Sequence, residues 1–211
     1  MKGIIIRPAE RRDAPAIGRG VVMALGSELP LYMAGDDPRR LPLVEQLFTD
    51  LAAADNSQYS WRNTLVAATP DGSVAGILVS YDGARLHELR RAFIAGAKRV
   101  LDSEIREEEL PDETDAEEIY LDSLAVFPEF RGHGLGAALI DAAAQHHARN
   151  NADTLKNTDG GNSAPTTSPK PLGLLCDPDN PRAHALYERL GFRDVGRRYF
   201  TTHLMHHMQR G

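Results

Sequence analysis

The segment with the clearest chemical potential is a glycine-rich turn at residues 131–136, with the sequence RGHGLG. It follows an apolar run at 119–126 that is typical of a strand, and it precedes a helical pattern at 137–149. Glycine lets the backbone approach a ligand closely, and the N–H groups of a first helical turn lack acceptors within the helix. Arg131 adds a guanidinium that suits phosphate oxygens. The segment therefore predicts a site for an anion such as a pyrophosphate.

The same turn also fits the loose dinucleotide pattern G-x-G-x-x-G/A, through Gly132, Gly134 and Ala137. Its context argues against that fold. The turn lies past the middle of the chain, residues 128–131 separate it from its strand, and the acidic residue at the right distance, Asp153, falls in a polar segment. No G-K-S/T follows the turn, so a P-loop is excluded.

With its flanks, the turn strongly resembles the acyl-CoA-binding motif of the GNAT N-acetyltransferase family, whose pattern is Q/R-x-x-G-x-G/A. The matching residues, 124–136, are LAVFPEFRGHGLG. A second segment at 180–192, NPRAHALYERLGF, resembles the later helix motif of that family and follows in the expected order. The resemblance implies an α+β (mixed α/β) fold. It has a twisted mixed sheet of six to seven strands with splayed central parallel strands, flanked by four to five helices.

The resemblance also implies acetyl-CoA as co-substrate. The strand at 119–126 would splay from a parallel neighbour at 172–176, with the pantetheine arm in the gap and the pyrophosphate on the turn. An extended arm with amides can pair with a strand edge. Asn180, before Pro181, matches a family position whose side chain often contacts the cofactor arm. By residue type it is also a helix N-cap, and the two roles are compatible. The cofactor-binding residues implied are Leu124, Ala125, Val126, Arg131, Gly132, His133, Gly134, Leu135, Gly136 and Asn180.

Three side chains are candidates for proton transfer. Tyr187 matches the family position whose hydroxyl protonates the leaving thiolate, and simple packing on the sheet is the alternative. Because side chains alternate along a strand, Glu118, Tyr120 and Asp122 share one face. Asp122 is a charge within an apolar strand, which costs free energy unless it is paired or functional. We expect Asp122 to be the base or the amine anchor, with Glu118 second; an ion pair or a capping contact is the alternative.

These residues predict direct transfer of an acetyl group to a primary amine in a ternary complex, with a backbone N–H near Val126 stabilising the oxyanion. The acceptor is a small molecule or peptide. The acidic stretch at 104–118 is either a solvated segment or a feature that favours a cationic acceptor. The alternatives are a silent acyl-CoA-binding sensor or scaffold and an acetyltransferase of protein N-termini or lysines. A homodimer is compatible with the sequence.

Composition limits the partners and the location. The net charge of −6 argues against a nucleic-acid partner, and the absence of a long apolar run argues against a membrane partner. One cysteine and no signal-peptide pattern fit a cytoplasmic protein. Cys176 is expected to be a small buried hydrophobe. His203, His206 and His207 predict no metal site, because His206 and His207 point to opposite faces of a strand.

The whole chain, 1–211, is expected to form one domain with a mobile polar loop at 150–171. We expect strands at residues 4–7, 65–69, 74–81, 119–126 and 172–176, and two more within 192–208. We expect helices at residues 14–25, 41–54, 85–101, 137–149 and 181–190. The helix at 41–54 would bury a stripe made of Leu43, Leu47, Leu51 and Ala54.

Overall fold

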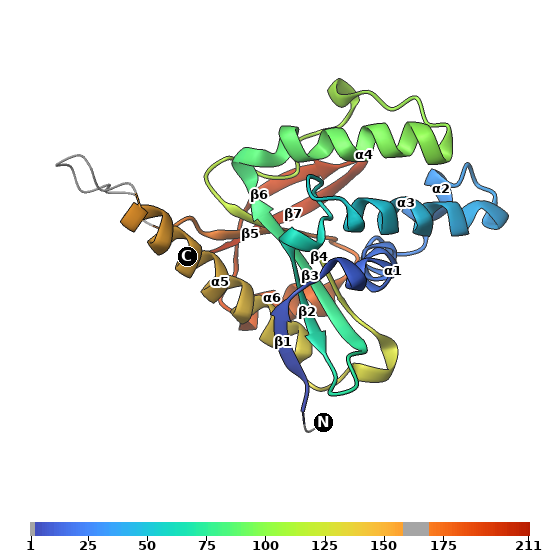
Figure 1. Ribbon diagram of the computed structural model, residues 1–211. Coiled ribbons are helices and arrows are strands. Elements are labelled where there is room, and N and C mark those ends of the chain that lie inside the picture. Colours follow the sequence, from blue (N-terminus) through green and yellow to red (C-terminus); the bar gives the residue numbers. More distant parts are fainter. Residues whose placement is uncertain (1–2, 158–168) are drawn as a thin grey trace.

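The computed structural model describes residues 3–157 and 169–211, and the side chains of all of these except 151–157. One seven-stranded sheet with the order β1-β2-β3-β4-β5-β7-β6 forms its centre (Figure 1). The strands are β1 (Ile5–Pro8), β2 (Thr64–Ala68), β3 (Val74–Asp82), β4 (Ile119–Val126), β5 (Leu172–Cys176), β6 (Arg193–Phe200) and β7 (His203–Arg210). Neighbouring strands are antiparallel, except that β4 and β5 are parallel.

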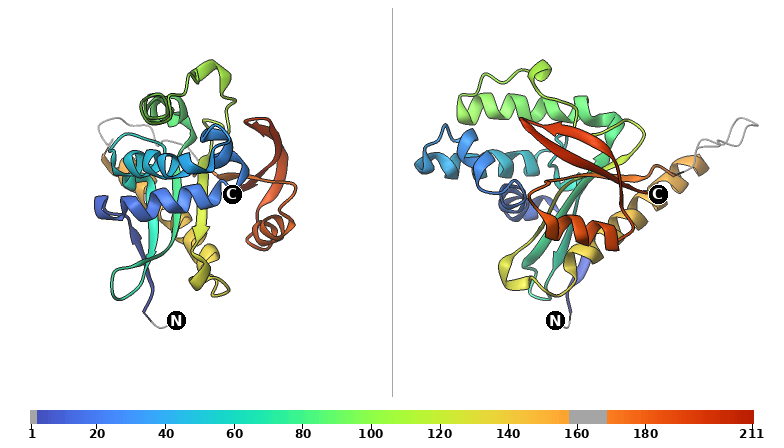
Figure 2. Two further views of the ribbon diagram at one scale, coloured as in Figure 1. Left: turned by 90° about the vertical axis from the view of Figure 1, so that its right-hand side faces the viewer. Right: turned by 180° about the vertical axis from the view of Figure 1, so that it is seen from behind.

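In the described part of the chain, six α-helices flank this sheet. They are α1 (Ala14–Ala24), α2 (Glu28–Met33), α3 (Leu41–Ala53), α4 (Leu86–Leu101), α5 (Leu135–Asn157) and α6 (Pro181–Arg189). Figure 2 shows α6 and the β6–β7 hairpin together on the side of the molecule that faces away from the viewer in Figure 1. The expected α+β architecture is confirmed, and α2 is a short helix that the sequence did not predict.

Among the described residues, two large apolar clusters lie on the two faces of the sheet, and a smaller one joins β3, β4 and the start of α4. Alternating side chains divide β2 between the two large clusters, because Val66 packs with α1 and α3 while Leu65 and Ala67 pack with α5. All five residues of β2 are buried. The strand that bears the candidate base, β4, also contributes residues to both large clusters.

Two predicted details were wrong. Leu43 is 40% exposed, and α3 instead buries Val44 and Phe48 together with Leu47 and Leu51, because the apolar stripe is centred about one residue further along the helix. The loop expected at 150–171 also begins later, since α5 continues to Asn157. Residues 158–168 of that loop lie outside the described residues.

The acidic segment at 104–118 was expected to be solvated, and only part of it is. Glu107–Glu109 form an exposed turn of 3-10 helix, whereas Glu113, Thr114 and Glu118 are buried. The segment therefore brings carboxylates into the protein interior beside β4. Among the described residues, no helix combines the length and apolar composition needed to cross a bilayer.

Candidate active site

The two parallel strands at the centre of the sheet separate after a short paired stretch. Pairing joins only Ile119 to Leu172 and Tyr120 to Gly173, although β4 continues to Val126 and β5 to Cys176. In the described part of the chain, the later residues of β4 thus have no strand partner on this side. An open strand edge inside a sheet can take an added extended segment.

The direction of the β4 backbone groups follows from its ladder with β3. The Phe127 N–H donates to the Ala75 carbonyl at 3.0 Å. Consecutive residues of a strand face opposite edges, so Leu124 and Val126 face away from β3 and into the gap. The Val126 carbonyl agrees with this, because it accepts from Arg131 Nε at 3.0 Å. The amide groups of Leu124 and the N–H of Val126 are therefore available to a ligand with its own amides.

The glycine-rich turn leads from this edge into α5. Gly132 and Gly134 have φ values of +78° and +75°, a conformation that favours glycine, and a Cβ at either residue would meet no atom within 4 Å. The Ala138 N–H closes the first helical turn on the Gly134 carbonyl at 3.0 Å. The N–H groups before it have no acceptor within the helix. The turn is thus open and rich in donors, as an anion requires.

Arg131, which was expected to bind phosphate, contacts other groups of the protein in the structure. Arg131 does not extend over the glycines, because its Nε binds the Val126 carbonyl and its Nη2 lies 3.5 Å from Met23 Sδ. His133 Nδ1 lies 2.7 Å from the Arg131 carbonyl and holds the turn from within. Arg131 fixes the end of β4 here, and its role at phosphate remains a prediction.

Asp122 occupies an irregular position in β4. Ser123 lies opposite Val79 and Leu121 opposite Ser80, so Asp122 is the extra residue of a β-bulge. Its Oδ1 accepts from Ser123 Oγ at 2.7 Å, and its Oδ2 lies 3.5 Å from the Tyr81 hydroxyl. Burial, and then the nearby Glu113 carboxylate, raise the pKa of Asp122 to about 7, against these two hydrogen bonds. A carboxylate with such a pKa is suited to accept a proton at neutral pH.

Tyr187 lies near Cys176, the last residue of β5. It is on α6, with its ring 5.8 Å from that of Phe192 in an edge-on contact. Burial, with a smaller effect from Cys176, raises the pKa of Tyr187 to about 12. The hydroxyl therefore keeps its proton at neutral pH. The packing of the ring is confirmed, the described residues offer its hydroxyl no hydrogen-bond partner, and its role as donor to sulfur stays a prediction.

Comparison with known families agrees with this geometry. A family model described as acetyltransferase (GNAT) domain matches residues 62–194, which include both motifs. The chain belongs to the GNAT acetyltransferase family. Members of this family use acetyl-CoA. A search of the curated proteins gives no match.

Solved structures resemble this GNAT chain over almost its whole length. A crystal structure described as an acetyltransferase shares 29% identity, with 98% of each chain covered and a TM-score of 0.70. An N-acetyltransferase from Staphylococcus aureus Mu50 shares 20% identity, covering 97% of this chain and 99% of that chain with a TM-score of 0.67. At 20% identity, the similarity to the Staphylococcus aureus protein shows a shared fold alone.

Glu113 is a residue of the GNAT site that sequence reasoning missed. It accepts from Gln58 Nε2 at 2.8 Å, from the Tyr81 hydroxyl at 3.3 Å and from Arg90 at 3.3 Å. Burial raises the pKa of Glu113, and the Arg90 charge opposes the rise. Arg90 was a signal for this cluster, because it is a cation next to Leu89 on the apolar side of α4 and is 2% exposed. Such a charge needs a buried partner.

Glu118, the second candidate base, is fully engaged elsewhere. It accepts from Thr114 Oγ1 at 2.7 Å, from His207 Nε2 at 2.9 Å and from Gln209 Nε2 at 2.7 Å. Burial alone would raise the pKa of Glu118, but these hydrogen bonds, led by that of His207, lower it. The Asp115 N–H also donates to the Glu118 carboxylate at 3.2 Å. A buried carboxylate with four donors and a lowered pKa is a weak base. The geometry favours Asp122 over Glu118 as the candidate base.

Asn180 directly precedes α6 and Cys176 ends β5, as the sequence predicted. The Asn180 side chain accepts from the Ala183 N–H at 3.1 Å, so its N-cap role is confirmed, while its contact with the cofactor stays a prediction. Cys176 is buried as expected, and burial raises the pKa of its thiol to about 11. Thiolate chemistry is therefore disfavoured at this residue.

A cavity of about 440 Å³ has residues of β2, β3 and α5 among its lining. Within it, Ser80 Oγ is 2.9 Å from His147 Nε2. Burial lowers the pKa of His147 to about 4, so the ring is neutral at physiological pH. Neither Asp122 nor Tyr187 lines the cavity, although Tyr81, whose hydroxyl is 3.5 Å from Asp122 Oδ2, does.

Proposed function

We propose that this protein transfers an acetyl group from acetyl-CoA to the primary amine of an acceptor, directly and within a ternary complex. The observation that carries the proposal is the open edge of β4. It lies between a donor-rich turn at one end and a partly exposed carboxylate with a raised pKa at the other. The turn fits a diphosphate, the edge fits an arm with amides, and the carboxylate fits an amine that must lose a proton.

Asp122 is the proposed base. An acceptor that arrives as an ammonium ion first loses one proton to solvent, because only the neutral amine has a free electron pair. The neutral amine then attacks the thioester carbon, and its nitrogen gives a second proton to the Asp122 carboxylate, directly or through one water. The backbone N–H of Val126, directed into the gap, donates to the carbonyl oxygen as it gains negative charge. Positioning the two substrates side by side supplies most of the remaining acceleration.

Tyr187 is the proposed donor to sulfur. When the carbon–sulfur bond breaks, the electron pair remains on sulfur, and the neutral Tyr187 hydroxyl donates a hydrogen bond to it. Cys176 is not needed as a nucleophile, since its thiol pKa is raised and it is buried. No covalent enzyme intermediate is part of this proposal.

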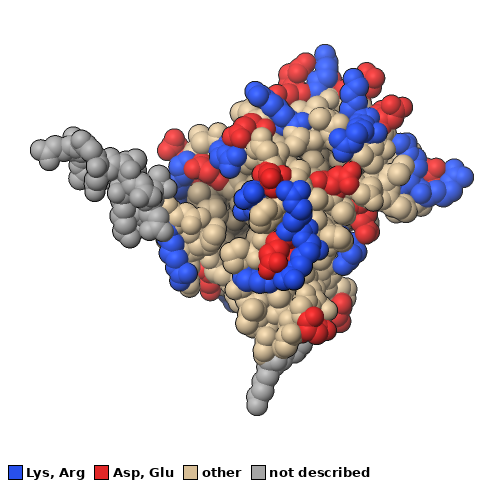
Figure 3. Space-filling view, in the orientation of Figure 1, with Lys and Arg blue, Asp and Glu red and all other residues tan. Residues whose placement is uncertain are grey.

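The acceptor is proposed to be a small-molecule or peptide amine that reaches the site as an ammonium ion. Asp122 and Glu113 favour a cation there. On the face shown in Figure 3, acidic and basic side chains are interspersed, which fits a compact acceptor better than a nucleic acid. Thiol release measured across a panel of amines tests turnover, and a protein that binds CoA without releasing thiol would be a silent sensor instead.

Substitution of Gly134 by alanine is expected to weaken CoA binding roughly 10- to 100-fold. At a φ of +75° a side chain is strained, so the turn must change and lose one or more N–H donors to the diphosphate. A hydrogen bond to a charged group contributes about 1.5–3 kcal/mol. Titration calorimetry with CoA measures the effect.

Gly72→Ala is the matched control, because Gly72 also has a positive φ, +88°, and open surroundings but lies in the turn between β2 and β3. It should destabilise the fold similarly and leave CoA affinity unchanged. If well-folded wild-type protein gives no heat with CoA at millimolar concentration, the proposed function is wrong.

Substitution of Glu113 by glutamine is expected to move the acidic limb of the kcat/KM profile to lower pH. Glu113 is the second cause of the raised Asp122 pKa, after burial, so removing its charge lets Asp122 ionise more easily. Arg90 keeps Asp112 and the Leu110 and Pro111 carbonyls as partners, so the fold should persist. An unmoved limb with normal folding would exclude Glu113 as a positioning residue for the base.

A further inference from the structure

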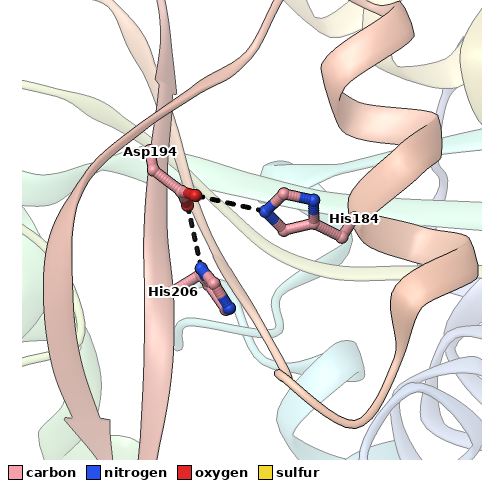
Figure 4. Close-up of side chains that lie close together, drawn as sticks. All are labelled: His184, Asp194 and His206. Carbon is pink, nitrogen blue, oxygen red and sulfur yellow. Dashed lines mark hydrogen bonds and ion pairs between the residues drawn. The ribbon is translucent and has the colours of Figure 1, made fainter.

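Three potential metal ligands converge where α6 meets the β6–β7 hairpin. Asp194 on β6 lies between His184 on α6 and His206 on β7 (Figure 4). His184 Nε2 is 3.3 Å from one carboxylate oxygen of Asp194, and His206 Nδ1 is 3.0 Å from the other. Figure 4 shows both rings directed at the carboxylate, and one ligand atom from each residue lies within 4.8 Å of the others.

The local fold explains why residues so far apart in sequence meet here. Gly191, with a φ of +90°, turns the chain sharply after α6, so β6 returns beside the helix. The pairing of β6 with β7 then skips Val195, because Asp194 lies opposite Met208 and Gly196 opposite His207. A bulge of this kind redirects neighbouring side chains, and it brings Asp194 into reach of His206.

The carboxylates around the cluster suit a cation. The Glu188 carboxylate, one turn along α6, is 3.7 Å from His184 Nδ1, while Asp194 faces Nε2 of the same ring. The two carboxylates thus lie beside opposite nitrogens of the ring. A carboxylate behind a ligating imidazole is the usual support of a metal-bound histidine.

We propose that His184, Asp194 and His206 bind a divalent transition-metal ion of the zinc class, with Glu188 orienting the His184 ring. Two imidazole nitrogens and one carboxylate oxygen are ligands that Zn²⁺ takes at about 2.0–2.2 Å. Ligand atoms on neighbouring corners of such a tetrahedron are then about 3.3–3.5 Å apart, close to the separations above. The cluster is partly exposed, so a water molecule can complete the coordination.

A second group of potential ligands does not carry the same inference. Asp115, Glu118 and His207 also lie within reach of one another. However, Arg198 contacts both Asp115 and His207, and Glu118 already accepts from Thr114 and Gln209. A cation there would face the Arg198 guanidinium and a carboxylate whose oxygens already accept several hydrogen bonds. Asp194, by contrast, makes its side-chain hydrogen bonds to the two imidazoles.

The proposed ion would fasten α6 to the β6–β7 hairpin. That helix carries Tyr187 and is capped by Asn180, so the ion would hold these two candidate residues in place. This differs from the expectation of no metal, which compared only histidines on one strand. The two further ligands come from α6 and from the bulge in β6, and neither position is visible as a spacing in the sequence.

The test is zinc titration of the full-length, untagged, chelator-stripped protein in competition with a chromophoric indicator. We expect one Zn²⁺ per chain, with affinity reduced at least tenfold in His184→Ala and in His206→Ala, and about 10- to 100-fold in Glu188→Gln. Zinc should also raise the unfolding temperature of the wild type and not that of His206→Ala. His203→Ala, on the same strand and exposed, and His146→Ala on α5 are the controls and should bind normally.

Two outcomes would overturn the proposal. One is the absence of stoichiometric Zn²⁺ binding at micromolar concentration; the other is binding that His203→Ala or His146→Ala weakens as much as His206→Ala does. CoA titration of the same samples keeps this result separate from the proposed acetyl transfer, because loss of zinc binding leaves the diphosphate turn intact.

Discussion

The Asp122→Asn variant is expected to lose about 10²- to 10⁴-fold in kcat/KM for acetyl transfer. Asparagine keeps the size of the side chain and the acceptor for Ser123 Oγ, so the bulge in β4 persists. It cannot take the proton of the amine. The loss should be largest near and above pH 7, where the wild-type carboxylate with a pKa of about 7 is ionised, and smaller at pH 5, where it is protonated. Steady-state thiol release from pH 5 to 9 measures both effects.

The stability of the same variant provides an independent check on its folding. The pKa of Asp122 is about 7 in the folded protein, above the ordinary aspartate value of 3.8, so folding takes up a proton between these pH values. This carboxyl therefore costs the folded state increasing free energy as the pH rises from about 4 to 7, and the full cost above 7. Asp122→Asn should raise the unfolding temperature relative to wild type at pH 8 and change it little at pH 4.

Asp141→Asn serves as the matched control, since Asp141 is an exposed residue of α5 paired with Arg210. It should keep wild-type kcat/KM at every pH. Wild-type kcat/KM in Asp122→Asn across the pH range would exclude Asp122 as the base and leave only a role in the bulge.

The architecture and the conformation of the glycine-rich turn could be predicted because their signals are local. A strand, a glycine turn and a helix follow one another in the chain, and the positive φ values of Gly132 and Gly134 depend on residue type. The N-cap role of Asn180 is also local and was predicted. Family resemblance added the splay between β4 and β5, which local pattern alone does not encode, because divergence of two strands is a property of the whole sheet.

The environment of the candidate base could not be predicted, because it depends on pairing between distant segments. The bulge at Asp122 appears only in the register of β3 against β4. Glu113 lies in a segment whose charge predicts exposure to solvent, and its burial is stabilised by Arg90 of α4 together with Gln58 and Tyr81. Simple alternation placed Glu118 on the same face as Asp122, but it did not reveal that His207 and Gln209 of β7 hold Glu118.

The positions of these two glutamates give them different effects on the base. Glu113 connects to Asp122 through the Tyr81 hydroxyl, which lies within 3.5 Å of both carboxylates, so its charge acts on the base. Glu118 instead fastens β4 to β7 at the point where β4 and β5 still pair. The same acidic segment thus supplies Glu113, whose charge raises the pKa of Asp122, and Glu118, which holds β4 where it begins to separate from β5.

The Tyr187→Phe variant is expected to lose about 10- to 100-fold in kcat, with little change in KM for acetyl-CoA. A hydroxyl with a pKa of about 12 does not fully transfer its proton to a thiolate whose thiol has a pKa near 8.5. It donates a hydrogen bond as negative charge develops on sulfur, which is worth about 1.5–3 kcal/mol in the transition state. Because that charge is absent from the bound substrate, the effect falls on kcat.

Phenylalanine retains the ring that packs against Phe192, so the unfolding temperature of Tyr187→Phe should stay close to that of wild type. Tyr199→Phe is the control, because Tyr199 is 56% exposed on β6 and should tolerate the change without loss of kcat. A thioester with a more acidic thiol gains less from the hydrogen bond, so the variant's deficit should shrink with such a donor. An unchanged kcat in Tyr187→Phe would assign the residue to packing alone and require another donor to sulfur.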